Sequence, residues 1–219
     1  AGTTNFTFSP VGSTVRMTPA ISAWPGATIR TIEPEPGVDG RAFLAYRVTG
    51  PVAGLYHYEY AIYNQNLDRG IQSFSVPRLL VPDADGAGPE QNVGFHGPPQ
   101  QPGFPNDGTQ GDAGFSSAEW TYTSDATSLT WNSETFAQNQ NANAIRWGTL
   151  YNFRFDADQP PQVANATIGF LKTGSPITVA AQAPSTGATP TPTPTATPTP
   201  TIQITVQTTP AGLTFTVDG

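Results

Sequence analysis

The chain has 219 residues, of which 22 are glycine, 23 are proline and only 11% are charged, a composition that favours short strands over helices. Nine basic residues against sixteen acidic ones give a net charge of −7, which excludes the clustered basic surface that nucleic-acid binding needs. The absence of cysteine excludes disulfides and cysteine-bound zinc, and no apolar run approaches the ~18 residues of a membrane-spanning helix.

Residues 1–183 contain segments in which apolar and polar residues alternate, at the spacing typical of an antiparallel β-sandwich. The expected strands are residues 5–8, 41–49, 55–63, 71–76, 119–123, 129–131, 146–156, 166–170 and 177–179. The sequence therefore predicts one all-β domain, an antiparallel β-sandwich of Ig-like or jelly-roll-like type.

Residues 55–63 carry the clearest pattern, because three tyrosines share one face of the strand whereas His57 lies on the other. Residues 71–76 follow after a short polar loop, and we expect the two strands to form a hairpin. The spacing in residues 146–156 likewise places Trp147 among the aromatic residues of the core.

A long irregular stretch, residues 81–114, interrupts the strand pattern, and we place any binding role there. Within it, Asp83, Asp85 and Glu90 supply closely spaced carboxylates of the kind that calcium prefers. The third aspartate and the terminal glutamate of an EF-hand are missing, and aspartates in such sequences also form Asx turns. A structural calcium is the only cofactor that the sequence offers, with plain turns as the alternative.

Catalytic machinery is sparse. A serine hydrolase needs a histidine as general base, and the sequence has two histidines, His57 and His96. It contains no G-x-S-x-G motif, the turn that carries the nucleophilic serine in such enzymes. His57 and Glu59 form either a dyad or a solvent-facing pair, and we favour the pair. The glutamates lack the spaced arrangement on one strand face that glycoside hydrolysis uses. The sequence therefore predicts a protein that is not an enzyme.

Carbohydrate binding is the ligand hypothesis that the aromatic residues support, since sugar rings stack on exposed indole or phenol rings. Trp24 and Trp120 are the candidates, and Trp24, in an Ala-Trp-Pro-Gly context, is the one we expect to be exposed. The alternative is that aromatic residues at this spacing fill the sandwich core.

Residues 184–201 are rich in alternating threonine and proline, and each proline fixes its own φ and removes an N–H group. This pattern predicts an extended, polyproline-like linker. Threonine in such segments is a frequent target of O-glycosylation. The candidate positions are Thr189, Thr191, Thr193, Thr195, Thr197 and Thr199.

Alternation resumes in residues 202–219, which we expect to form a β-hairpin. Its apolar positions are Ile202, Ile204, Val206, Leu213, Phe215 and Val217. A two-stranded hairpin cannot bury its apolar face alone, so it either begins a second domain or is donated to the sheet of a neighbour. The motif VQTTPAGLTFTVDG resembles the opening of PEGA-like repeats of bacterial surface proteins, which favours the first alternative.

The runs YHYEYAIYNQNLDRGIQSFSVP (residues 56–77) and NANAIRWGTLYNFRFD (residues 141–156) resemble motifs in a family of uncharacterised, secreted, multi-domain bacterial proteins. The resemblance covers most of residues 4–175 and departs from the family in the longer loop around residues 81–110. It implies export and a modular surface protein, but it implies no activity, because none is assigned to the family.

Together these patterns predict a non-catalytic, extracellular structural or adhesive module of a bacterial surface protein. Its expected partners are copies of itself or neighbouring domains of the same protein. Two alternatives stay open: a filament subunit that donates its C-terminal strands to a neighbour, and a carbohydrate-binding module. Because the chain starts at Ala1 without a leader sequence, we expect a processed or excised polypeptide.

Overall fold

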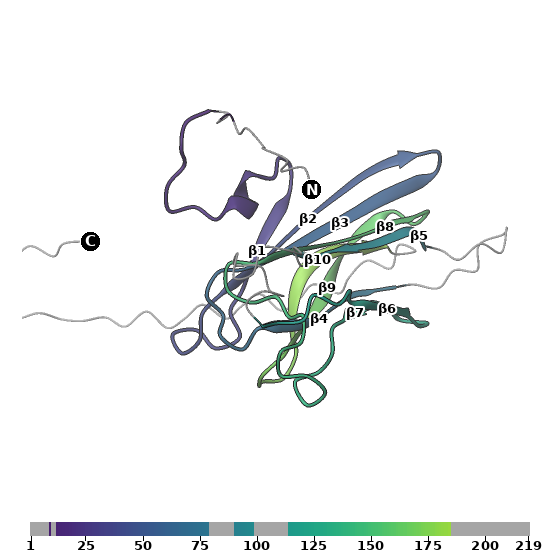
Figure 1. Ribbon diagram of the computed structural model, residues 1–219. Coiled ribbons are helices and arrows are strands. Elements are labelled where there is room, and N and C mark those ends of the chain that lie inside the picture. The colour runs from purple at the N-terminus through teal and green to yellow at the C-terminus, as the bar shows by residue number, and fades with distance from the viewer. Residues whose placement is uncertain (1–8, 10–11, 79–89, 99–113, 185–219) are drawn as a thin grey trace, which may run out of the picture. The chain divides into compact units, whose positions relative to one another are not determined.

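The computed structural model describes residue 9 and residues 12–78, 90–98 and 114–184, and the structural statements below concern these residues. They contain ten strands and one short 3-10 helix, η1 (Ala20–Ala23). The strands form two five-stranded sheets in which all neighbours are antiparallel (Figure 1). The predicted all-β architecture with two antiparallel sheets is confirmed. No helix of the described residues is long and apolar enough to cross a membrane.

The order of strands in the sheets brings distant segments together. The first sheet contains β1 (Thr28–Ile32), β2 (Ala42–Val52), β3 (Leu55–Asn64), β8 (Leu150–Ala157) and β5 (Glu90–His96). The second contains β10 (Ile177–Pro184), β9 (Pro161–Phe170), β4 (Ile71–Pro77), β7 (Ser128–Asn132) and β6 (Thr121–Ser124). The chain crosses between the sheets after β3 and again before β8. A bridge between Ile71 and Ile145 shows that these two crossings lie side by side.

Aromatic side chains fill the interior between the sheets, as the alternation along the strands predicts. Tyr60, Phe74, Trp131 and Phe153 are fully buried, and the rings of Phe74 and Phe153, from opposite sheets, have centroids 4.9 Å apart. The hydroxyl of Tyr60 donates a 2.7 Å hydrogen bond to the carbonyl of Gln182, so its polar end is satisfied. Burying one such side chain contributes roughly 1.5–3 kcal/mol.

Two strands were not predicted. β1 is a short edge strand beside β2, and β5 lies inside the stretch that was expected to be irregular. The pairing of β5 with β8 shifts register between Gln91 and Gly94, and Asn92 has a φ of 51°. Such an irregularity breaks the period-two alternation, which explains why the sequence pattern missed β5.

The expected hairpin of residues 55–63 and 71–76 is wrong. β3 pairs with β2 and β8, whereas β4 pairs with β7 and β9 in the other sheet. The loop between β3 and β4 carries the chain from one layer to the other instead of folding it back. β10 extends to Pro184, where the linker was expected to begin. Residues 5–8, the rest of the linker with its threonines and the hairpin of residues 202–219 lie outside the described residues.

Candidate functional site

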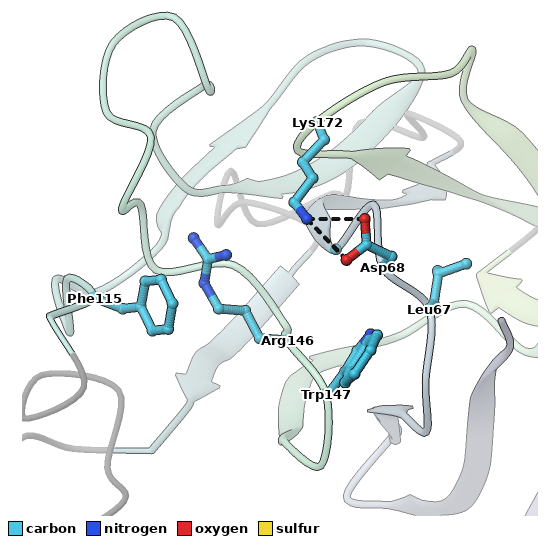
Figure 2. A pocket seen from close by; sticks show the side chains of 7 residues that line it. Leu67, Asp68, Phe115, Arg146, Trp147 and Lys172 are labelled. Carbon is cyan, nitrogen blue, oxygen red and sulfur yellow. Dashed lines mark hydrogen bonds and ion pairs between the residues drawn. The ribbon is translucent and has the colours of Figure 1, made fainter. Parts of the chain in front are cut away.

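The candidate site is an open pocket of about 330 Å³ at the end of the sandwich where the two crossings meet (Figure 2). We name it the Trp147 pocket. It is lined by Leu67, Asp68, Gly70, Phe115, Arg146, Trp147 and Lys172. Ligand sites generally occupy about 300–1,000 Å³, so this pocket is of a size for one small ligand.

Asn64, the last residue of β3, fixes the loop on one side of the pocket. Its buried side-chain amide donates to the carbonyls of Leu67 and Ile145 at 3.0 and 2.9 Å, and its Oδ1 accepts the Leu67 N–H at 2.8 Å. Gly70 has a φ of 63°, a left-handed conformation that glycine adopts without strain. The loop is therefore joined by buried hydrogen bonds to the opposite crossing.

Trp147 lies on a tight turn that faces this loop. The Thr149 N–H donates to the Arg146 carbonyl at 3.1 Å, and Gly148, with a φ of 77°, occupies the third position of the turn. The turn is tied to β3 because the Gly148 N–H donates to the Asn64 carbonyl at 2.8 Å. Trp147 is 62% exposed and has no hydrogen bond or ring contact within the described residues. Its indole is an exposed platform on a well-supported turn.

The prediction that Trp147 belongs to the core is wrong. The prediction assumed one continuous strand over residues 146–156, but β8 begins at Leu150, after the turn. The alternation of side chains in a strand does not continue through a turn, and Gly148 is the residue in the sequence that indicates this turn.

Three charged side chains share the pocket with the indole. The Lys172 ammonium contacts both carboxylate oxygens of Asp68 at 2.9 Å, and 104 residues separate the two in sequence. Arg146 lies beside them in Figure 2, with its guanidinium 3.8 Å from the ring centre of Phe115. The pocket thus offers one flat apolar face, two cations and one carboxylate.

The guanidinium of Arg146 is only partly satisfied. Its Nη2 donates to the carbonyls of Gln140 and Ala142, each at 3.2 Å, while its Nε is buried and has no hydrogen-bond partner. Within the described residues it forms no ion pair with a carboxylate. Burial lowers the pKa of Arg146, and the nearby Tyr151 opposes this effect.

The two tryptophans that the sequence proposed for sugar binding lie elsewhere. Trp24 is half-buried against a small apolar cluster on the outer face of the first sheet and lines a second open pocket of about 370 Å³, together with Glu59 and Asn152. Trp120 is only 4% exposed, stacks on Phe95 and donates its indole N–H to a backbone carbonyl. Burial leaves Trp120 no free face for a sugar, so it is removed from the candidates.

Glu90, one of the three candidate calcium ligands, is already engaged by another side chain. Glu90 begins β5, and its carboxylate accepts a 2.7 Å hydrogen bond from Arg78 and is almost fully buried. Asp83 and Asp85 lie outside the described residues. Among the residues that are described, no group of three histidine, aspartate or glutamate side chains could hold a metal ion.

His57 pairs with a residue that the sequence did not indicate. Its Nδ1 lies 2.5 Å from Oδ1 of Asp156 on β8, whereas Glu59 Oε2 is 3.8 Å from its Nε2. Burial raises the pKa of Asp156, but hydrogen bonds from Asn92 and His57 outweigh it and hold this pKa below its usual value. The predicted pair of His57 and Glu59 is present at 3.8 Å, but Asp156 is the nearer partner of His57.

Comparisons of the chain with protein-family models, with curated protein sequences and with solved structures found no match. The function must therefore be argued from the geometry of the site.

Proposed function

We propose that this chain is a non-catalytic adhesive module of an extracellular bacterial surface protein, and that its sandwich binds saccharides in the Trp147 pocket. The observation that carries the proposal is the exposed indole of Trp147, held on a hydrogen-bonded turn beside polar groups. Sandwich domains commonly present binding residues on loops at one end of their sheets, as here.

The chemistry of the pocket suits a sugar ring. The face of an indole is electron-rich, and the C–H groups on one face of a pyranose are weakly positive, so the two stack. Hydroxyl groups need both donors and acceptors, which Lys172, Arg146 and Asp68 supply in the same pocket. Because the indole is already ordered by its turn, little conformational freedom is lost on binding.

The organisation of the chain supports an adhesive role. The Thr/Pro-rich linker of residues 184–201 would hold the sandwich away from a neighbouring domain or a cell surface. The pairing of the consecutive strands β3 and β4 with β8 and β7 supports a jelly-roll-like topology. The resemblance of residues 56–77 and 141–156 to secreted surface proteins supports an extracellular location.

The test is retention of the full chain by a panel of immobilised neutral and acidic polysaccharides, in affinity electrophoresis. We expect Trp147→Ala to abolish retention by every polysaccharide that holds the wild type. Trp24→Ala is the matched control, because Trp24 lines the other pocket, and it should leave retention unchanged. Loss of retention in Trp24→Ala alone would move the site to that pocket, and no retention of the wild type by any polysaccharide would overturn the proposal.

A second candidate function is assembly by strand donation. Among the described residues, β10, the eight-residue strand that precedes the linker, ends its sheet and pairs only with β9, so within that part of the chain its other edge is open to a strand from a neighbour. The alternating residues 202–219 would supply that strand, and head-to-tail donation generates filaments. Light scattering should then show oligomers of the full chain that Phe215→Asp dissolves. A monomeric wild type excludes this candidate.

A further inference from the structure

We propose that the saccharide bound in the Trp147 pocket carries a carboxylate, as uronic acids do, and that Arg146 recognises it. This inference rests on the proposed function and adds the class of ligand. Its basis is the unequal balance of charge in the pocket: two cations, Arg146 and Lys172, accompany the single carboxylate of Asp68. In a chain of net charge −7, a pocket with an excess of positive charge selects anions locally.

Arg146 is the cation without a counter-ion. Lys172 contacts both oxygens of Asp68, so that carboxylate is already engaged. Arg146 donates only from Nη2, to two backbone carbonyls, and neither Nε nor Nη1 has a hydrogen-bond partner within the described residues. Charged groups that are partly withdrawn from water are normally paired. An incoming carboxylate would pair this charge through Nη1, because Nε is buried.

Arg69 is an arginine whose charge is fully paired within the fold. Its Nε donates to Asp39 at 2.6 Å, its Nη2 lies 3.1 Å from Glu35, and its guanidinium lies over the ring of Phe170. Arg146 has the matching contact with an aromatic ring but no carboxylate. The exposed arginines Arg16, Arg30, Arg47 and Arg154 also lack a carboxylate partner within the described residues, but water can solvate them, whereas Arg146 is half-buried.

The indole and the guanidinium line the same pocket. Trp147 and Arg146 are consecutive residues of one turn, and a saccharide that fills the pocket can contact the indole with its ring and the guanidinium with a carboxylate substituent. The ammonium of Lys172 has three hydrogens and contacts two oxygens of Asp68, which leaves one for the ligand. A volume of about 330 Å³ suits a single terminal acidic sugar better than a dense polyanion, which the net negative charge of the chain repels.

The test compares two ligands that differ only at C6. Methyl β-glucuronide carries a carboxylate there, and methyl β-glucoside carries a hydroxymethyl group. In ligand-observed NMR titrations of the full chain, we expect the glucuronide to bind about tenfold tighter, the difference that one charge-assisted hydrogen bond supplies. Arg146→Gln should lower the affinity for the glucuronide more than the affinity for the glucoside, so that the tenfold preference is lost.

Controls separate the outcomes. Arg154→Gln replaces an exposed arginine on β8 that does not line the pocket, and it should keep the preference. Equal binding of both ligands by the wild type, lost in Trp147→Ala, would overturn the acidic specificity while retaining the saccharide site. A preference that survives in Arg146→Gln would assign recognition to another cation and overturn the role of Arg146. No binding of either ligand would overturn the inference, and polysaccharide retention would then decide the proposed function by itself.

Discussion

The corner around Arg69 and the pocket around Arg146 each contain an arginine, but within the described residues only Arg69 is paired with carboxylates. Each guanidinium lies over a phenylalanine ring, that of Phe170 at 5.3 Å and that of Phe115 at 3.8 Å. The hydrogen bond to Asp39 raises the pKa of Arg69 and outweighs burial, which lowers it. Burial dominates at Arg146 and lowers its pKa. The fold satisfies the first arginine internally and leaves the second partly unsatisfied at an open surface.

The partners of the two arginines explain this difference. Asp39 accepts the Asp68 N–H at 2.9 Å and the Gly40 N–H at 2.7 Å in addition to Arg69, so one carboxylate joins two distant segments of the chain, residues 39–40 and 68–69. Arg146 donates only to carbonyls of its own preceding loop. The Arg69 corner therefore joins distant segments of the fold, whereas Arg146 makes its hydrogen bonds within its own loop. A charge can therefore remain available to a ligand where neighbouring segments are already joined by other bonds.

The largest effect is expected from Arg69→Ala. The side chain of Arg69 is 7% exposed and that of Asp39 is 11% exposed, so removing the arginine leaves a buried carboxylate without its cation. We expect the free energy of unfolding in urea to fall by about 3 kcal/mol. The double variant Arg69→Ala/Asp39→Ala should lose less than the sum of the two single changes. Additive losses would show that the pair does not act as a unit.

Arg146→Ala should cost less. The variant loses two hydrogen bonds to carbonyls and the contact with Phe115, but no carboxylate is left unpaired. We expect the free energy of unfolding to fall by about 1 kcal/mol in the same urea titration. A loss as large as that of Arg69→Ala would contradict the difference between the two arginines, because Arg146 would then be a structural cross-link.

Acid should weaken the Arg69 corner. Burial raises the pKa of Asp39, but the hydrogen bonds from Arg69 and from two backbone N–H groups outweigh it and hold the pKa below 3.8. A carboxyl with a lowered folded pKa stabilises the protein fully above its unfolded pKa, and this stability is lost as the pH falls through the folded value. Below about pH 4, unfolding free energy should therefore fall more steeply in the wild type than in Asp39→Asn. Parallel curves from urea titrations between neutral and acidic pH would contradict this assignment.

Alternation was sufficient to predict most of the strands, but neither their pairing nor the pocket. In residues 55–63 the tyrosines alternate without interruption, and Tyr58 and Tyr60 are buried as expected. The residues that share one face of a strand can be predicted from the strand's own sequence, because its side chains point alternately to the two sides of the sheet. Where a turn or a shift in register intervenes, as before β8 and within β5, this local rule no longer holds.

The charged members of the pocket could not be found from local pattern. Asp68 and Lys172 meet because β9 ends beside the loop that follows β3, a consequence of sheet order and not of spacing. Arg146 is recognised only by its missing partner, which requires coordinates. Sequence reasoning therefore chose Trp24 and Trp120 by their context, whereas exposure and neighbours select Trp147.

The smallest effect on stability is expected from Trp147→Ala, and this variant separates ligand binding from stability. The indole has no hydrogen bond or ring contact within the described residues, so its removal takes away little packing. We expect the free energy of unfolding to change by no more than about 0.5 kcal/mol, while saccharide retention is lost. A fall of more than about 1 kcal/mol in urea titrations would place Trp147 among the residues that hold the fold together. The turn would then be ordered by its indole and not by the hydrogen bonds of Thr149 and Gly148, and the platform would not be preformed.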